Sequence, residues 1–384
     1  MQAYLDNAAT TPLRPEVIEV MHEALQQTFG NPSSTHGFGR TARTQIETAR
    51  KSIAAHFNAQ PQEIIFTSGG TESDNMLLRC AVEDLGVQTI ISSKIEHHAI
   101  THALDFLETK GCNIIYIPID QNGQIDYDML DKALASDDSK KLVTLMHINN
   151  EIGTILDLAR VAESCQKHHA LFHSDAVQGV GHYEIDLSEI KIDFLSAAAH
   201  KFHGPKGIGF SFVRKNSGLN PFILGGGQER GLRAGTESVH NIMGMAKALE
   251  LSYANLATEK EYILSLKQHL IQGLKSIFPS LHLNGCCGDL SQSTYTLVNV
   301  CLPVPAEKAG LLDFHLDLKG IACSKGSACQ AGSNIGSHVL EEVVPKELKS
   351  HPSIRFSFSR FNTKEEINYL LEVLAEFSTT SIAS

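Results

Sequence analysis

A lysine at the end of an apolar run is the first candidate for chemistry. The run Asp193–Ala199 has the length of a buried strand, and His200, Lys201 and a turn rich in glycine and proline follow it. A parallel strand delivers its last side chains to the carboxyl edge of the sheet, where α/β folds build their sites. Desolvation there lowers the pKa of a lysine, whose amine can then hold an aldehyde cofactor as a Schiff base. Considered alone, Lys201 is better explained as a surface lysine in a strand-to-turn corner, so the rest of the chain decides.

Two other segments supply groups that such a cofactor requires. Asp175 ends an apolar strand, and a carboxylate there keeps a pyridine nitrogen protonated, which makes the ring an electron sink. The turn Thr67–Ser73 follows a strand and opens a helix, with Gly70 and Thr71 where backbone N–H groups attract phosphate. An N-cap and a plain turn are the alternatives. Lysine, aspartate and phosphate turn together indicate pyridoxal phosphate.

Further polar residues follow predicted strands. Asn150, next to Asn149 and Glu151, suits the hydroxyl of the cofactor ring, and His97 suits a position over the ring, where it can shuttle protons. Arg355 lies inside an apolar strand, and a buried guanidinium needs an anion. A substrate carboxylate and a structural salt bridge are equally good explanations of Arg355.

A cysteine occupies a segment of small residues. Cys329 lies in the stretch Ser324–Ser337, which leaves an apolar strand and is predicted to pack little. A thiol on an exposed, mobile loop is typical of a reactive cysteine. Its neighbour Cys323 lies at the strand end and is interpreted as a buried hydrophobe.

Composition narrows the class of protein. The chain has 384 residues, with 32 Lys and Arg against 43 Asp and Glu, a formal charge of −11. This charge argues against nucleic acid or an anionic membrane as the main partner. No signal-peptide pattern or transmembrane stretch is evident, so we expect a cytoplasmic protein. The eight cysteines lack a CxxC pair, which predicts neither a disulfide framework nor a metal site, and the 19 histidines are interpreted as polar surface.

Strands and helices alternate in the first two thirds of the chain. Predicted strands lie at 63–67, 89–92, 114–119, 142–147, 171–174, 193–199 and 208–213, and predicted helices at 16–28, 41–57, 71–84 and 239–277. This rhythm predicts an α/β fold with a mainly parallel sheet. The remainder, with strands at 297–301 and 354–357 and a closing helix from 363, indicates a smaller α+β unit. We therefore expect a large cofactor-binding domain at 16–260 and a small domain at 1–15 and 261–384.

The motifs together resemble one family almost from end to end. The chain is similar to the cysteine desulfurases of the NifS/IscS type, which are pyridoxal-phosphate enzymes of the class V aminotransferase group and fold type I. The matching segments are YLDNAATTP, FGNPSSTHGFGR, EIIFTSGGTESDN, SKIEHHA, MHINNEIG, HSDAVQGVG, AAAHKFHGPKGIG, GGGQERGLRAGT, GSAC and SIRFSFSRF.

The resemblance implies a role for each matching residue. It implies conversion of L-cysteine to L-alanine in a homodimer, with the sulfur left as a persulfide for a sulfur-acceptor protein of iron–sulfur cluster assembly or tRNA thiolation. Lys201 would hold the cofactor, Asp175 its ring nitrogen, and His97 its ring. Asn150 and Gln178 would contact the ring hydroxyl, and the cofactor phosphate would be bound by Gly70, Thr71, His200 and Thr236 of the other subunit. Asn31 and Arg355 would bind the substrate carboxylate. Cys329 would accept the sulfur and could also transiently ligate an iron–sulfur cluster.

The chain departs from the family pattern at two places. Ala198 stands where relatives have a serine, so one hydroxyl for the cofactor phosphate is lost. The chain also ends soon after its closing helix, without the longer tail that some relatives use to dock an iron–sulfur scaffold. A selenocysteine lyase, another class V enzyme and an inactive sulfur-relay subunit are the alternatives. The intact set of Lys201, Asp175, His97 and Cys329 disfavours the inactive subunit.

Overall fold

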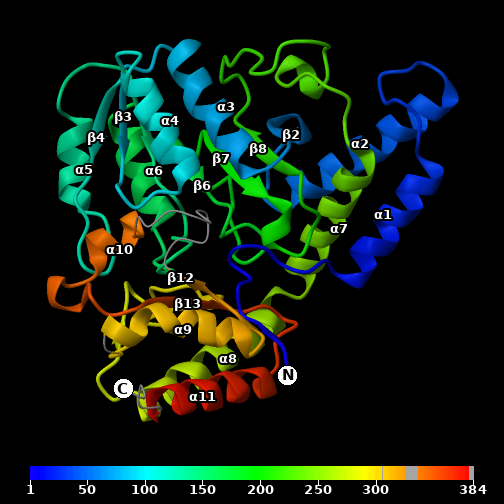
Figure 1. The fold of residues 1–384 in the computed structure, drawn as a ribbon. Coiled ribbons are helices and arrows are strands. Elements are labelled where there is room, and N and C mark those ends of the chain that lie inside the picture. The colour runs from blue at the N-terminus through cyan, green and yellow to red at the C-terminus, as the bar shows by residue number, and fades with distance from the viewer. Residues whose placement is uncertain (305, 326–335, 380–384) are drawn as a thin grey trace.

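The computed structural model of the chain describes residues 1–304, 306–325 and 336–379, and of residues 306 and 307 only the backbone. Figure 1 shows a large sheet wrapped by helices in its upper part and a smaller sheet with its own helices below. Short 3-10 turns also occur, among them Ala199–Lys201 and Glu229–Gly231. The helices are Pro15–Gln27 (α1), Gly37–Ala55 (α2), Gly70–Glu83 (α3), His98–Glu108 (α4), Tyr127–Leu134 (α5), Leu158–Lys167 (α6), Val239–Ala254 (α7), Leu256–Ile277 (α8), Ala306–Leu318 (α9), His338–Val343 (α10) and Lys364–Thr379 (α11).

The large sheet has seven strands in the order β2-β8-β7-β6-β5-β3-β4. The block from β7 to β4 is parallel, whereas β8 runs antiparallel to both β2 and β7. The connection from β7 to β8 is too short for the crossover that a parallel pair requires. The strands are Ile64–Thr67 (β2), Thr89–Ser92 (β3), Asn113–Tyr116 (β4), Lys141–Thr144 (β5), Leu171–Asp175 (β6), Phe194–Ala198 (β7) and Gly209–Val213 (β8).

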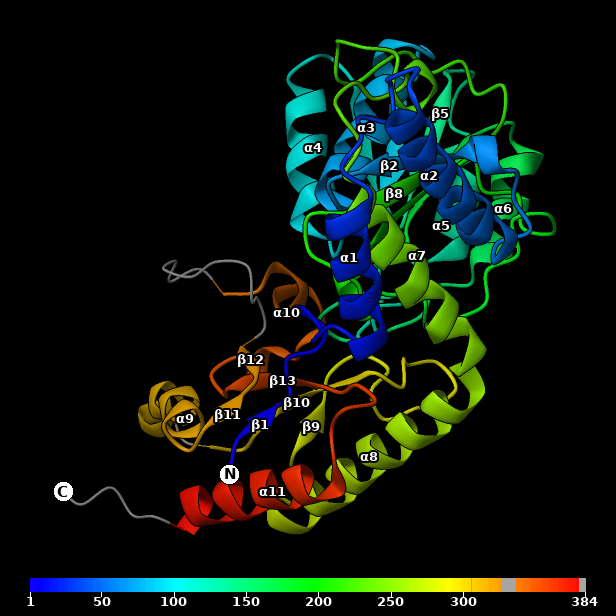
Figure 2. The same ribbon diagram turned by 90° about the vertical axis from the view of Figure 1, so that its right-hand side faces the viewer.

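A smaller antiparallel sheet lies beneath the first. Its order is β12-β13-β10-β9, and a separate two-stranded parallel sheet pairs β1 with β11. Figure 2 shows α8 and α11 side by side below these strands. The strands are Ala3–Tyr4 (β1), His282–Leu283 (β9), Leu297–Cys301 (β10), Ile321–Ala322 (β11), Ser324–Lys325 (β12) and Ser353–Ser357 (β13).

Two groups of buried side chains follow the two sheets. One apolar cluster joins the large sheet to α2 and α7, and another joins the small sheet to α8, α11 and residues Ala3, Leu5 and Ala8 of the N-terminal segment. The domain division at 1–15, 16–260 and 261–384 stays a proposal, and its boundary at 260 falls inside α8. The α/β class with a mainly parallel sheet is confirmed.

Several element bounds differ from the prediction. Helix α2 begins at Gly37, because His36 caps it by accepting a hydrogen bond from the Gly39 amide at 3.3 Å. The region 239–277 forms two helices, since Asn255 leaves helical geometry between α7 and α8. The N-terminal segment, where no strand was predicted, contains β1, which pairs with β11 across the length of the chain. Thr363 and Glu366 form a capping box at the start of α11.

Within the described ranges, no helix combines the length and apolar character needed to cross a bilayer.

Candidate active site

A cavity of about 330 Å³ lies at the carboxyl edge of the large sheet. Ligands of open α/β sheets bind at this edge, because polar side chains and helix N-termini meet there. Walls come from both parts of the molecule, including Ala8 of the N-terminal segment and Arg355 of β13. Nine residues predicted for the site line this one cavity: Gly70, Thr71, His97, Asn150, Asp175, Gln178, His200, Lys201 and Arg355.

Lys201 lies on the 3-10 turn that follows β7. Strand β7 is buried over its whole length, and the chain leaves it through Ala199 and His200. The ammonium group of Lys201 donates hydrogen bonds to the carbonyl oxygens of Ala8 at 2.6 Å and Ala9 at 2.9 Å. The N-terminal segment therefore holds the amine at the cavity wall.

Asp175 ends β6 beside β7. Its Oδ1 accepts a hydrogen bond from the Val177 amide at 2.9 Å, and the residue is 5% exposed. Burial raises the pKa of the Asp175 carboxyl, although the Val177 amide and Lys201 oppose the shift. Burial, and next the charge of Asp175, raise the pKa of Asp74, which also lines the cavity. A cation placed against Asp175 would stabilise its ionised form.

His97 precedes α4 and caps it. Its Nδ1 accepts a hydrogen bond from the Ala99 amide at 3.1 Å, so the proton of the neutral ring belongs on Nε2. Burial, and next the charge of Lys201, lower the pKa of His97 to about 4. A neutral imidazole at the wall can lie over an aromatic ring and transfer a proton.

The start of α3 forms one end of the cavity. Among the described residues no side chain caps this helix, and a Cβ added at Gly70 would approach Val177 Cγ2 to 2.7 Å, so a larger residue there would displace Val177. The same Cβ would lie 3.8 Å from Ala198 Cβ. Free amides at a helix N-terminus bind phosphate. His200 lies close by, and burial lowers its pKa to about 4 while Nδ1 contacts Thr10 Oγ1 at 3.2 Å.

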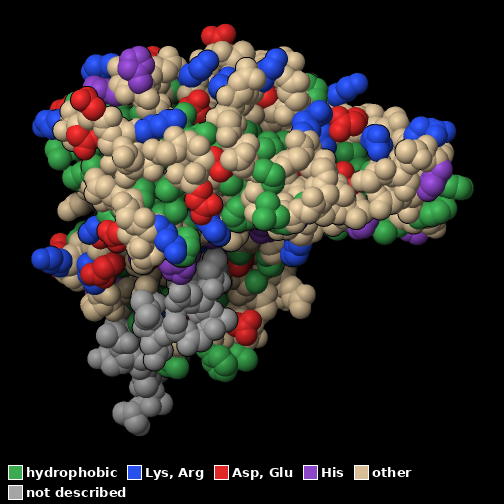
Figure 3. Space-filling view, turned by 90° about the horizontal axis from the view of Figure 1, so that it is seen from above, with side chains coloured by type: hydrophobic (Ala, Val, Ile, Leu, Met, Phe, Trp, Pro, Cys, Tyr) green, Lys and Arg blue, Asp and Glu red, His purple; other side chains and the backbone are tan. Residues whose placement is uncertain are grey.

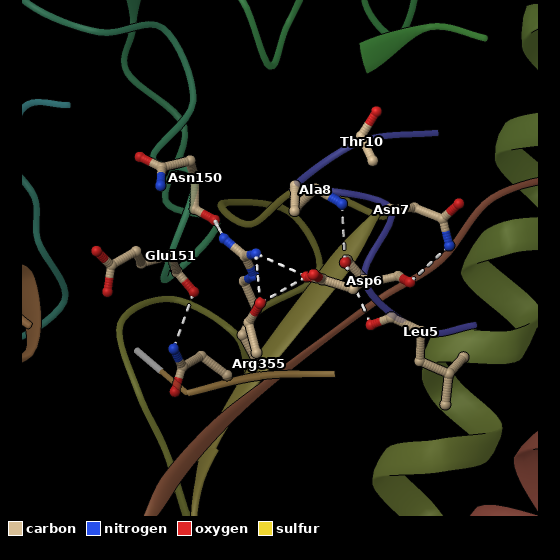
Figure 4. Close-up of polar contacts among 12 residues, drawn as sticks. Leu5, Asp6, Asn7, Ala8, Thr10, Asn150, Glu151 and Arg355 are labelled. Carbon is tan, nitrogen blue, oxygen red and sulfur yellow. Dashed lines mark hydrogen bonds and ion pairs between the residues drawn. The ribbon is translucent and has the colours of Figure 1, made fainter. Parts of the chain in front are cut away.

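Arg355 forms the structural salt bridge that the sequence left open, and its role toward a substrate carboxylate stays a prediction. It lines the cavity and also forms a salt bridge from Nη2 to Asp6 Oδ1 at 2.9 Å. Nη1 donates to the carbonyl of Asn150 at 2.7 Å, and Figure 4 shows this guanidinium between Asn150 and Asp6.

The carboxyl of Glu151 accepts a hydrogen bond from Ser337 at 2.5 Å, and burial raises the pKa of Glu151 to about 7.

Gln178 also lines the cavity, and its side-chain amide donates a hydrogen bond to the Ala8 carbonyl at 2.9 Å. The backbone of the N-terminal segment thus meets both Gln178 and Lys201. Sequence reasoning missed Asp6, Ala8 and Ala9 as site residues. No local pattern in the run DNAATTP assigns these residues to the site, since their contacts reach residues more than 160 positions away.

Two predicted residues do not line the cavity, and a third is not among the described residues. Asn31 is exposed in the loop before α2, where its Oδ1 accepts from the Ser33 amide, and it does not line this cavity. Thr236 is exposed on the glycine-rich loop and lines no part of the cavity within one chain. Both stay predictions. Cys329 lies outside the described residues.

Comparison with known proteins gives consistent matches. The family model described as aminotransferase class-V matches residues 3–370. The chain belongs to this family.

The chain is 44% identical to a protein named cysteine desulfurase IscS from Dictyoglomus turgidum, and the match covers 97% of this chain and 93% of that one. Among solved structures, a NifS-like protein has a TM-score of 0.89 at 34% identity over 98% of this chain and 99% of that one. A structure titled SspA in complex with cysteine has a TM-score of 0.81 at 32% identity, covering 94% and 100%. Within the class-V aminotransferases, the chain therefore groups with the cysteine desulfurases.

The site of this class-V protein fits pyridoxal phosphate, the cofactor of the family. Lys201 offers an amine for the aldehyde, and the raised pKa of Asp175 marks a carboxyl that a protonated ring nitrogen would stabilise. The uncapped start of α3 offers amides for the phosphate. Three separate parts of the cofactor thus have matching groups in one cavity.

The loss of the family serine at position 198 leads to a prediction. Ala198→Ser is expected to tighten cofactor binding, because its hydroxyl would lie beside the start of α3, where a hydrogen bond to a charged group contributes about 1.5–3 kcal/mol. Turnover at saturating cofactor should not rise, since the hydroxyl contacts no bond that reacts. A fluorescence titration of the apoprotein with pyridoxal phosphate measures the change. An unchanged dissociation constant would mean that another group already occupies this place.

Proposed function

We propose that this chain converts L-cysteine to L-alanine and leaves the sulfur as a persulfide on Cys329. The observation that carries the proposal is the single cavity in which Lys201, Asp175, His97 and Arg355 meet. The similarity to proteins named cysteine desulfurase and to a relative solved with cysteine supports the choice of substrate.

Each residue of the cavity would have a separate role in the reaction. When bound, pyridoxal phosphate supplies an electron sink that weakens the bonds at Cα and Cβ of an amino acid. Asp175 would keep the ring nitrogen charged, which that sink requires. Arg355 would orient the substrate carboxylate, and Lys201, once its amine is released, would take and return the α-proton. His97 would exchange a proton with the substrate, and its neutral ring with a proton on Nε2 supports this role.

Sulfur transfer requires a thiolate. The Cys329 thiolate would attack the substrate sulfur, so that an S–S bond forms while the Cβ–S bond breaks and its electron pair stays on Cβ. Protonation of Cβ completes alanine, and the persulfide remains on the enzyme. The test is simple: the protein reconstituted with pyridoxal phosphate should form alanine from L-cysteine in the presence of a reducing thiol. Alanine formation that occurs only from L-selenocysteine would favour a selenocysteine lyase instead.

We further propose a homodimer in which each cofactor site is completed by Thr236 of the other subunit. Figure 3 shows the arm of α1 and α2 reaching out from the molecule, with apolar and histidine side chains at its tip. The exposed apolar residues of this arm are Ile18, Leu25, Phe29 and Phe38. Patches of this kind are typical of protein interfaces. Both ends of the glycine-rich loop, 225–227 and 235–236, are exposed, and their glycines permit close approach.

Light scattering should give the mass of a dimer for the cofactor-loaded protein. Thr236→Ala should weaken cofactor binding in the dimer without changing its mass, because the hydroxyl acts from the other subunit. A fully active monomer would contradict this prediction.

The sulfur acceptor is proposed at the level of its chemistry, a protein with an accessible thiol. Iron–sulfur cluster assembly and tRNA thiolation both use such acceptors, and location in the cytoplasm stays a prediction. Capture of partners under non-reducing conditions, with the persulfide-loaded protein as bait, would identify the acceptor through a mixed disulfide.

A further inference from the structure

The N-terminal segment places Asp6 beside Arg355. Ser357, two residues after Arg355 on β13, donates its amide to the Leu5 carbonyl at 2.8 Å and accepts from the Ala8 amide on its hydroxyl at 2.8 Å. These bonds hold the chain on both sides of Asp6. The carboxylate is therefore fixed by the backbone, and it is not an incidental surface partner of the arginine.

Asp6 already neutralises the guanidinium. Its Oδ1 lies 2.9 Å from Arg355 Nη2 and accepts from Ser324 Oγ at 2.7 Å, while Ser324 Oγ also accepts from Nη2 at 3.2 Å. The Arg355 side chain is 3% exposed and that of Asp6 19%. Arg355 Nε is buried and has no hydrogen-bond partner among the described residues. Arg355 can therefore still donate a hydrogen bond from Nε, although its positive charge is already balanced by Asp6.

An incoming carboxylate meets this balanced pair. Glu151 is another acid whose charge acts on Arg355. Burial raises the pKa of Glu151 to about 7, so a fraction of the molecules carry a protonated Glu151 at neutral pH. Two carboxylates on one guanidinium repel each other, and the repulsion is strong where water is excluded. The cation is shared, so the affinity for the second anion falls.

We propose that Asp6 limits the affinity of the site for carboxylates: it is the resident counter-ion with which a substrate carboxylate must share Arg355. This inference rests on the proposed role of Arg355 in binding that carboxylate. Asp6 limits the affinity for amino acids, and it does so for substrate and product alike, so that L-alanine is released readily. Uniform weakening of this kind raises KM without lowering the chemical rate.

The test removes the charge and keeps the shape. Asp6→Asn retains an oxygen that accepts from both Arg355 and Ser324. In calorimetric titrations of the holoenzyme, this variant should bind L-alanine about tenfold more tightly than the parent. L-Alaninamide, which lacks the carboxylate, should bind within about twofold of the parent value. KM for L-cysteine should fall with the L-alanine constant, while kcat does not rise.

A matched control removes an acid from another ion pair. Asp137 pairs with Lys141 at 2.8 Å at the opposite, amino end of β5, and Asp137→Asn should leave both affinities unchanged. Arg355→Gln should abolish the preference for L-alanine over L-alaninamide. If that preference survives in Arg355→Gln, the role of Arg355 and the inference on Asp6 are both wrong. If it is lost there, but folded Asp6→Asn binds L-alanine no better than the parent, only the inference on Asp6 is overturned.

A second variant covers the case in which Asp6→Asn does not fold. Ser324→Ala removes the hydroxyl that shares the charge of Asp6, so the carboxylate acts on Arg355 alone. L-Alanine affinity should then fall about threefold, the loss expected for one hydrogen bond. An unchanged or higher affinity in this variant would contradict the inference.

Discussion

Lys201→Ala is expected to bind pyridoxal phosphate without the yellow absorption band of the parent protein and to form no alanine from L-cysteine. The amine of Lys201 is the group at the cavity wall that can join the cofactor aldehyde, and it is also the proposed carrier of the α-proton. Loss of proton transfer alone lowers turnover by about 10²–10⁴-fold. Absorbance after dialysis, together with alanine formation, measures both effects.

Lys206→Ala is the matched control for this substitution. Lys206 lies five positions further along the same connection but is exposed and does not line the cavity. This variant should keep the absorption band and the turnover of the parent. If the Lys201→Ala protein kept the band after dialysis, and borohydride reduction then attached the cofactor covalently to the protein, another lysine would be the anchor, and the assignment of Lys201 would be wrong.

The groups that could be predicted from the sequence lie at the ends of elements. Asp175 follows a buried strand, Gly70 opens a helix, and Lys201 follows the apolar run of β7. In a parallel sheet such positions meet at one edge, so local patterns suffice to place them in one site. The sheet itself was predictable for the same reason, apart from the antiparallel direction of β8.

The contribution of the N-terminal segment could not be predicted. Its carbonyl groups at Ala8 and Ala9 contact Lys201, and Asp6 contacts Arg355, through pairings across most of the chain. Backbone carbonyls carry no residue-type signal, and a tight turn of small residues looks the same wherever it packs. For the same reason, the sequence could not decide whether Arg355 pairs with an acid of the protein or with a substrate carboxylate.

The interpretation of the histidines as polar surface was wrong for several of them. His173 is completely buried on β6, with Nδ1 2.8 Å from Thr144 Oγ1 and Nε2 3.2 Å from Ser196 Oγ. Burial lowers the pKa of His173 to about 3, so the ring is neutral. His147 and His203 are also buried. A neutral imidazole with hydrogen-bond partners can lie in a core, and composition does not distinguish it from an exposed one.

Cys329→Ser is expected to bind pyridoxal phosphate as the parent does but to form almost no alanine or sulfide from L-cysteine. A serine hydroxyl does not attack the sulfur of a bound substrate, because only a thiolate is a sufficiently good nucleophile at neutral pH. Cofactor binding should persist, since the cofactor groups are contributed by Lys201, Asp175 and the start of α3.

Cys323→Ser is the control, because both thiols would lie on one peptide. Cys323 lies between β11 and β12 and is partly buried, and burial, followed by the charge of Asp313, raises the pKa of its thiol to about 12. At neutral pH it is therefore protonated and a poor nucleophile, so Cys323→Ser should turn over nearly like the parent. Alanine formation and mass spectrometry of the trapped enzyme test the pair, with one added sulfur expected on Cys329. Fragmentation that placed the sulfur on Cys323, with Cys329→Ser still active, would make Cys323 the nucleophile, and its raised pKa would then have to be reversed by bound cofactor or substrate.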